Sequence, residues 1–286
     1  MSQPSAPALV GVIGGGRMGA GIVQTFAAAG SRVTVVESDK EAATAAVERV
    51  ATGLARAAER GKLAEEAGDI LARIDIADSL QGLPAAADLV IEAVPEDAKL
   101  KARLLAGAEE VVSETTILAT NTSSLSVTEL AAALRHPARF VGMHFFNPVP
   151  ASALVEIVVA PDTADATVRT AQDCTHALGK KDVVVKDSPG FASSRLGVAL
   201  GLEAIRMVEE GVAEPEAIDD AMHLGYRHPM GPLRLTDLVG LDVRLAIAEH
   251  LRTTLGERFA PPQLLRDKVA RGELGRKSGQ GFYTWE

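Results

Sequence analysis

The chain has 286 residues, of which 47% are hydrophobic and 23% charged, and its formal net charge is −9. Such a chain is long enough for one large or two modest globular domains. It has no apolar run of the roughly 18 residues that a membrane span needs, and an acidic surface argues against general binding to nucleic acids or membranes. Six scattered histidines and one cysteine, Cys174, predict neither a metal site nor an internal disulfide.

Residues 1–8 are polar and contain proline, without the features of a secretory signal. We expect a short disordered lead-in and a cytoplasmic protein.

From residue 9 to residue 185, short runs rich in Val, Ile and Leu alternate with longer alanine-rich segments. This alternation is typical of βαβ units around a parallel sheet. The runs predict strands over residues 9–13, 32–37, 89–92, 117–120, 139–144, 154–159 and 182–186. The intervening residues 40–72 are too many for one crossover helix and predict a pair of helices that turn near residues 60–62.

After residue 185 the strand pattern ends at Asp187-Ser188-Pro189-Gly190, and only helical periodicity follows. We expect helices over residues 196–210, 215–224, 232–238 and 241–255. The sequence pattern therefore predicts an α/β protein with two domains. Residues 1–187 form a Rossmann-type doubly wound domain with a helical-pair insertion, and residues 188–286 form a smaller all-α domain for substrate binding. Surplus apolar residues in the second domain predict a homodimer.

The first predicted strand runs directly into a G-x-G-x-x-G motif at the start of a helix, with the sequence Gly14-Gly15-Gly16-Arg17-Met18-Gly19. In this context Gly14 makes the tight turn, Gly16 admits a pyrophosphate and Gly19 lets the helix pack on the sheet. Glu37 ends the next strand, 21 positions after Gly16, where a carboxylate can bind the ribose hydroxyls and repel a 2'-phosphate. The motif predicts dinucleotide binding, with NAD favoured over NADP. Asp39 is a rival for the ribose, although it suits a helix cap better.

A histidine stands where another predicted strand ends, in Gly142-Met143-His144-Phe145-Phe146-Asn147-Pro148. Open parallel sheets bind ligands at this edge. Glu156 follows 12 residues later inside an apolar strand, where a carboxylate is costly to bury unless it is paired. We expect an imidazole as its partner.

With these motifs in order, the chain resembles the L-3-hydroxyacyl-CoA dehydrogenase family from Val10 to Trp285, and most of all the short members that act on 3-hydroxybutyryl-CoA. The matching segments are residues 11–21, 88–93, 121–125, 144–150, 154–156, 189–191, 228–232 and 275–283. The resemblance implies an NAD-dependent oxidoreductase of fatty acid metabolism. It would interconvert an (S)-3-hydroxyacyl-CoA and the 3-oxoacyl-CoA.

The resemblance also implies roles for individual residues. His144 is the general acid–base and Glu156 its orienting carboxylate; Ser123 contacts the substrate hydroxyl and the nicotinamide, unless it or Ser124 only caps the helix that follows. The remaining positions implied to line the cofactor are Glu96, Lys101, Asn121, Asn147 and Lys277. For the charged ones a solvated surface position is the alternative.

Two groups of substrate contacts follow from the same resemblance. The family has Asn after Gly-Phe-x-x, whereas this chain has Ser194, whose hydroxyl is shorter and lacks the second donor of an amide. Arg56, Arg60 and Lys62 lie on the helical insertion that brings basic residues to the CoA phosphates in the family. Arg56 and Arg60 are four apart and are expected on one helix face, though a solvated charged face fits them equally well.

Two other functions stay open. The enzyme could act on a carrier-protein thioester or a free hydroxy acid, since Ser194 departs from the family pattern. Alternatively, the chain could be a non-catalytic nucleotide-binding relative, although such a protein would not need both His144 and Glu156. Chain-length preference and the physiological direction of the reaction are not predicted.

Overall fold

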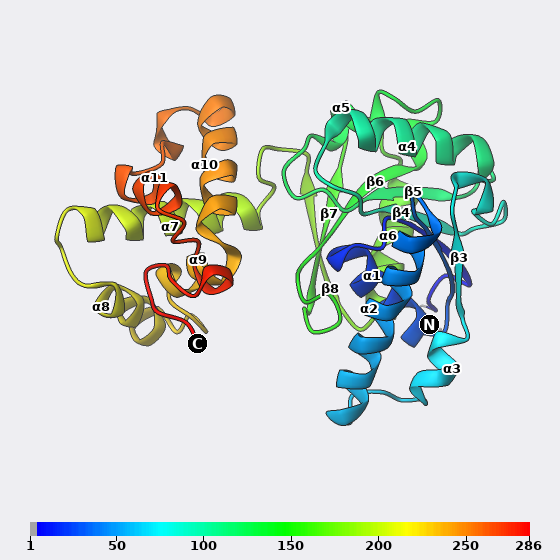
Figure 1. Cartoon of the computed structure of the whole chain (residues 1–286). Helices are drawn as coiled ribbons and strands as arrows, with labels where there is room; N and C mark the ends of the chain where they lie inside the picture. The colour runs from blue at the N-terminus through cyan, green and yellow to red at the C-terminus, as the bar shows by residue number, and fades with distance from the viewer. Residues whose placement is uncertain (1–4) are drawn as a thin grey trace. The chain divides into compact units, whose positions relative to one another are not determined.

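The computed structural model describes residues 5–286. The chain forms two compact units, the first ending at Asp187 and the second running from Ser188 to Glu286 (Figure 1). Residues 1–4, the first half of the expected disordered lead-in, lie outside the described part of the chain. No helix within residues 5–286 is both long and apolar enough to cross a membrane.

The first unit is built on one eight-stranded sheet with the order β3-β2-β1-β4-β5-β6-β7-β8. Its strands are β1 (Leu9–Ile13), β2 (Arg32–Val36), β3 (Ile74–Ala77), β4 (Leu89–Glu92), β5 (Ile117–Thr120), β6 (Phe140–Phe145), β7 (Leu154–Val159) and β8 (Lys181–Lys186). Every neighbouring pair is parallel except β6 and β7. The predicted α/β class is confirmed, but the expectation of a parallel sheet is wrong for β7 and β8, which run opposite to the other six strands.

The helices of the first unit are α1 (Arg17–Ala28), α2 (Lys40–Glu59), α3 (Ala67–Leu71), α4 (Ala98–Val111), α5 (Val127–Ala131) and α6 (Asp165–Ala177). The expected helical pair is present as α2 and α3. One apolar core joins one face of the sheet to α1, α2, α3 and α6, through Phe26, Leu54, Ile70 and Cys174 among others. Strand side chains alternate between faces, so neighbours of the core residues Met143 and Ile157 point to the opposite face. His144 and Glu156 are such neighbours.

Edge strand β3 was not predicted. Its side chains are half-buried or exposed, and Asp75 interrupts the apolar residues, so the strand lacks a hydrophobic run. Short 3-10 turns occur at η1 (Leu80–Gly82) and η2 (Pro137–Arg139) in this unit, and at η4 (Glu257–Phe259) and η5 (Arg276–Ser278) in the second.

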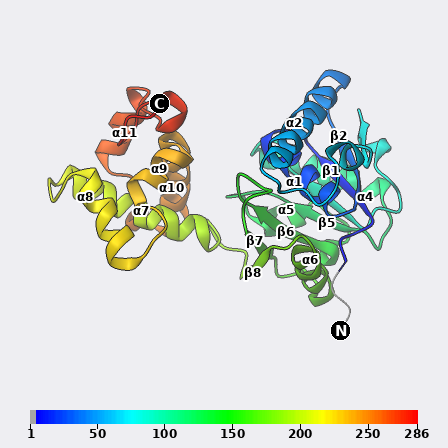
Figure 2. The same cartoon turned by 90° about the horizontal axis from the view of Figure 1, so that it is seen from below.

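The second unit is helical, with α7 (Ser193–Glu209), α8 (Pro215–Asp220), α9 (Pro232–Val239), α10 (Leu241–Leu255) and α11 (Gln263–Ala270). Its own core includes Val198 and Leu202 of α7 and Leu241, Ala248 and Leu251 of α10, and Figure 2 shows α7 beside α9 and α10. Helix α7 begins three residues before the predicted start. The predicted helix over residues 215–224 changes at Ala221 into a π-helical turn, η3 (Ala221–Gly225), and α11 was not predicted.

Two buried carboxylates hold the C-terminal segment of the second unit in place. Asp237, only 1% exposed, accepts hydrogen bonds from the backbone N–H groups of Phe282 and Tyr283 at 2.9 Å and from Trp285 Nε1 at 2.8 Å. Asp219 accepts the Tyr283 hydroxyl at 2.8 Å. These bonds hold the segment after α11 against α8 and α9.

Candidate active site

The glycine-rich turn after β1 has the geometry of a phosphate cradle. Gly14 has a φ of +94°, and a Cβ on Gly19 would lie 1.8 Å from the Gly14 carbonyl oxygen, so neither position tolerates a side chain. Nothing lies within 4 Å of the place that a Cβ of Gly16 would take. Helix α1 then begins at Arg17 without a side-chain cap, and the Met18 side chain packs against the core. The open space beside Gly16 and the uncapped helix end fit a pyrophosphate.

Glu37 lies one residue beyond β2, beside this turn. Its Oε1 accepts the Gly15 N–H at 2.5 Å, and its Oε2 accepts the Ser38 N–H at 3.3 Å. Asp39 instead caps α2 through the Ala42 N–H at 2.9 Å; this bond, with one from the Ser38 hydroxyl, lowers the pKa of Asp39. The structure therefore leaves Glu37 as the carboxylate beside the turn.

Arg49, which the sequence did not single out, reaches the same turn from α2. Its Nη1 donates to the Gly15 carbonyl at 3.1 Å. Arg49 also lines a groove between α1 and α2, together with Arg17, Arg56 and residues 147–150. Arg60, the C-cap residue of α2, and Lys62, which lies beyond the helix, do not line this groove. The common helix face of Arg56 and Arg60 stays a prediction.

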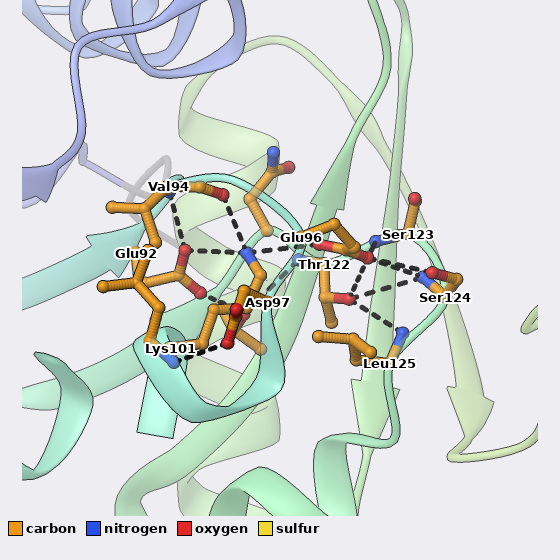
Figure 3. Close-up of polar contacts among 12 residues, drawn as sticks. Glu92, Val94, Glu96, Asp97, Lys101, Thr122, Ser123, Ser124 and Leu125 are labelled. Atoms are coloured by element: carbon orange, nitrogen blue, oxygen red, sulfur yellow. Dashed lines mark hydrogen bonds and ion pairs between the residues drawn. The ribbon is translucent and has the colours of Figure 1, made fainter. Parts of the chain in front are cut away.

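A buried ionic cluster stands at the ends of β4 and β5 (Figure 3). Lys101 of α4 and Glu92 of β4 are 1% and 0% exposed, and Lys101 Nζ donates to Glu92 Oε1 at 2.7 Å. The same Nζ lies 3.1 Å from the Val94 carbonyl oxygen and 3.3 Å from Glu96 Oε2. An ammonium has three protons, and each has a protein partner here. Lys101 thus organises its neighbours rather than presenting a donor to a cofactor.

Glu96 connects the ionic cluster to the loop after β5. Its Oε1 accepts the backbone N–H groups of Ser123 and Ser124, each at 3.1 Å, and the Thr122 hydroxyl at 2.6 Å. Burial opposes ionisation of Glu96, but Lys101 and these hydrogen bonds outweigh it and lower the pKa of the carboxyl group. Figure 3 shows the Ser123 side chain pointing away from Glu96.

The hydroxyl that caps α5 belongs to neither of the expected serines. Ser126 Oγ accepts the Glu129 N–H at 3.1 Å and is the N-cap residue of the helix. Capping by Ser123 or Ser124, which the sequence left as the alternative to a substrate role, is therefore wrong.

His144 and Glu156 face each other across the antiparallel pair β6 and β7, where they are direct register partners. His144 Nδ1 lies 2.8 Å from Glu156 Oε2, and the residues are 6% and 1% exposed. The Phe146 ring packs on the imidazole with centroids 4.4 Å apart. A proton on Nδ1 facing the carboxylate makes Nε2 the basic nitrogen of the ring.

Asn121 and Asn147 lie on either side of the β6 end. Asn121 Oδ1 accepts the Phe145 N–H at 2.9 Å and so ties the end of β5 to the strand that carries His144. Asn147 is exposed, precedes a cis proline, and lines the groove with Arg17 and Arg56. The amide of Asn121 thus has a structural partner, while that of Asn147 faces the groove.

Ser194 and Lys277 belong to the second unit and are described within it. Ser194 is half-buried in the first turn of α7. Lys277 is exposed and forms an ion pair with Asp242 at 2.6 Å. Burial opposes ionisation of Asp242, but Lys277 and backbone hydrogen bonds together outweigh it and lower the pKa of the carboxyl group.

Glu92 and Thr120 are members of the site that sequence reasoning missed. Thr120 Oγ1 donates to Glu92 Oε2 at 2.7 Å, and the Val94 N–H donates to Oε1 at 2.7 Å. The signal was available, because Glu92 interrupts the apolar run Leu89-Val90-Ile91 in the same way that Glu156 interrupts its strand.

Comparison with known proteins assigns both units to the same protein family. Residues 9–188 match the model of the 3-hydroxyacyl-CoA dehydrogenase NAD binding domain, and residues 190–285 match the C-terminal domain of the same family. A probable 3-hydroxybutyryl-CoA dehydrogenase of Bacillus subtilis is 45% identical over 277 residues, 96% of each chain. The mitochondrial hydroxyacyl-coenzyme A dehydrogenase of Homo sapiens is 40% identical over 97% of this chain and 91% of its own.

Solved structures show the same likeness. FadB2 of M. tuberculosis superposes with a TM-score of 0.93 at 43% identity, over 99% of this chain and 100% of its own. The (S)-3-hydroxybutyryl-CoA dehydrogenase PaaH1 of Ralstonia eutropha superposes with a TM-score of 0.92 at 42% identity, over 98% and 100% of the two chains.

Proposed function

Because the chain belongs to the 3-hydroxyacyl-CoA dehydrogenase family, we propose that it interconverts a short (S)-3-hydroxyacyl-CoA, such as 3-hydroxybutyryl-CoA, and the corresponding 3-oxoacyl-CoA. NAD, when bound, supplies the acceptor of the hydride. The open cradle beside Gly16 and the uncapped start of α1 fit its pyrophosphate, and Glu37 beside Gly15 fits its ribose.

The observation that carries the proposal is the buried pair of His144 and Glu156, 2.8 Å apart. In the oxidative direction, His144 Nε2 would take the proton of the 3-hydroxyl, and bound NAD would accept the hydride from C3. The C3–O single bond becomes a carbonyl, so atoms and electrons balance. Glu156 holds the proton on Nδ1 and stabilises the imidazolium that forms. In the reductive direction His144 returns the proton.

Two further roles are part of the proposal. The Glu92–Lys101–Glu96 cluster fixes the loop of residues 122–124, and this loop presents the Ser123 hydroxyl to the substrate. The groove of Arg17, Arg49 and Arg56 takes the CoA phosphates, since guanidinium groups bind phosphate through paired donors. Ser194, by resemblance, contacts the thioester end of the substrate.

The test is the initial rate of NADH oxidation with acetoacetyl-CoA. His144→Ala should lower kcat by roughly 10²- to 10⁴-fold, the usual contribution of a positioned acid–base group. Glu156→Gln should also act on kcat, and the double variant should be little slower than His144→Ala because both residues serve one proton transfer.

A matched control is available at the surface. His176 Nε2 lies 2.6 Å from Asp182 Oδ1, so it forms a similar imidazole–carboxylate pair outside the site. His176→Ala should leave kcat unchanged. Strictly additive losses from His144→Ala and Glu156→Gln would rule out the pair as one catalytic unit, and absence of turnover in the unmodified protein would favour a non-catalytic nucleotide-binding role.

Ser194 keeps one alternative substrate open, a thioester on a carrier protein, because the family's amide is missing there. The groove separates the two cases. Arg56→Met should raise KM for acetoacetyl-CoA and leave KM for acetoacetyl-pantetheine unchanged. If pantetheine or carrier-protein thioesters turn over faster than the CoA thioester, CoA is not the substrate carrier.

A further inference from the structure

Arg244 of α10 is a buried cation at the contact between α10 and α7. Only 6% of the residue is exposed. Its guanidinium lies over Gly197 of α7, with Nη1 3.2 Å from the place that a Cβ of Gly197 would take. The glycine therefore makes the room that the guanidinium occupies.

The guanidinium of Arg244 has no partner among residues 5–286. No hydrogen bond or ion pair of the described chain includes it, and its Nε is enclosed and unsatisfied. Of the three guanidinium nitrogens, only Nε is fully buried without a partner. The two terminal nitrogens keep some solvent exposure, so a ligand can reach them. Burial lowers the pKa of Arg244 to about 10, which keeps the group charged at neutral pH.

The other deeply buried arginine of the molecule shows what a paired guanidinium looks like: its Nε has no partner, as in Arg244, but both of its terminal nitrogens do. Arg139, 8% exposed, donates to the carbonyl oxygens of Ser113 and Thr116, and its Nη2 lies 3.5 Å from Glu109. A buried charge without such partners destabilises a fold by several kcal/mol. The isolated charge of Arg244 thus calls for an anion that the chain itself does not provide.

Arg244 lies one helical turn from a substrate position. Ser194 and Gly197 are three residues apart in α7, which places them on adjacent positions of one face with a rise of about 4.5 Å. Ser194 is the position proposed above to contact the thioester end of the substrate, so the inference rests on the proposed function. A six-carbon acyl group held at Ser194 by its thioester is about long enough to reach a guanidinium one helical turn away.

We propose that Arg244 binds a carboxylate at the far end of the acyl chain, so that the enzyme prefers 3-hydroxyacyl-CoA substrates whose acyl group ends in a carboxylate. A guanidinium pairs with a carboxylate through two parallel hydrogen bonds. A methyl-ended acyl chain would place apolar atoms against the unpaired charge and gain nothing from it. Phosphate offers similar chemistry, but the CoA phosphates already have the arginine groove of the first unit.

The experiment compares two six-carbon substrates of equal length with NADH, namely 3-oxoadipyl-CoA, which ends in a carboxylate, and 3-oxohexanoyl-CoA, which ends in a methyl group. The unmodified protein should favour the carboxylate by at least about tenfold in kcat/KM, the effect of one charged hydrogen-bonded pair. Arg244→Met should abolish this preference through KM for 3-oxoadipyl-CoA. It should leave kcat/KM for 3-oxohexanoyl-CoA equal or higher.

Arg252→Met is the matched control, because Arg252 lies on the same helix, is exposed and pairs with Glu257 at 3.0 Å. It should keep the preference. The Tm of Arg244→Met should not fall below that of the unmodified protein, since the substitution removes an unpaired buried charge. Calorimetric titration with adipyl-CoA and hexanoyl-CoA measures the same preference in the absence of turnover.

The results separate this inference from the proposed function. If methyl-ended substrates turn over but neither kinetics nor titration favours the carboxylate, the inference is overturned and the proposed function stands. Equal losses on both substrates in Arg244→Met would make Arg244 a ligand of CoA phosphate or a structural residue. Dissociation of an oligomer in that variant would assign Arg244 to a partner copy; each of these results also overturns the inference.

Discussion

Removing the Lys101 ammonium should destabilise the first unit by about 3 kcal/mol. Breaking a buried ion pair on one side leaves an uncompensated charge and loses roughly 3–5 kcal/mol. Glu92 is 0% exposed and would keep only the Val94 N–H and Thr120 Oγ1 as donors, which places Lys101→Met at the lower end of that range. For a unit of this size, Tm should fall by roughly 6–12 °C. Chemical denaturation followed by circular dichroism measures the loss.

Two further variants test this reasoning. Glu92→Gln combined with Lys101→Met removes both charges and keeps an acceptor for Thr120, so at least half of the lost stability should return. Arg135→Met removes one partner of an exposed pair, Arg135 and Glu110, and should lose less than about 1 kcal/mol. If Lys101→Met is no more destabilising than Arg135→Met, the cluster is hydrated and the argument from burial is wrong.

Three other predictions concern the cofactor, the cysteine and the assembly. Glu37→Ser should raise the NADPH to NADH ratio of kcat/KM on the order of tenfold, because it removes the carboxylate beside Gly15 and leaves Arg49 to meet a 2'-phosphate; an unchanged ratio would assign the choice to another residue. Burial raises the pKa of Cys174 to about 12, so its thiol should react with a disulfide reagent at pH 8 roughly 10³-fold more slowly in the native protein than in denaturant; equal rates would show an open pocket. We propose a homodimer formed through the second unit, and a monomer mass by light scattering at micromolar concentration would refute it. The exposed apolar side chains of this unit include Leu196, Leu235, Val239 and Val243.

The strands that carry the site could be predicted because they are buried on both faces. Five of the six interior strands, β1, β2, β4, β5 and β6, are parallel to one another, and the sixth, β7, was found from its apolar run even though its direction was not. The loop from Phe146 to Ala153 joins β6 to β7 and is shorter than the dozen or more residues that a parallel crossover needs, so the length of this loop could have predicted the antiparallel pairing. Edge strand β8 was found from three consecutive valines, although its side chains are half-buried or exposed. Edge strand β3 gave no such signal, because Asp75 interrupts its apolar residues.

The pairing of His144 with Glu156 could be inferred because a carboxylate inside an apolar strand needs a partner. The same reasoning applied to Glu92 would have found Lys101 and the cluster. Arg244 could not be found in this way, because α10 carries it among ordinary helical residues. Its isolation depends on Gly197, nearly fifty residues earlier, and such a contact is visible only when α7 and α10 are packed together.

The hydrogen bonds that Asp237 accepts bear on how the second unit folds. The N–H groups that donate them lie 45 and 46 residues further along the chain, so a loop that contains α10 and α11 must close before these bonds can form. Contacts of this range are entropically expensive until the intervening helices are formed. Until they form, Asp237 has water as its only partner. The segment from Phe282 to Trp285 is therefore expected to fold late and cooperatively. Its amide hydrogens should exchange with solvent at the slow rate at which the whole unit opens.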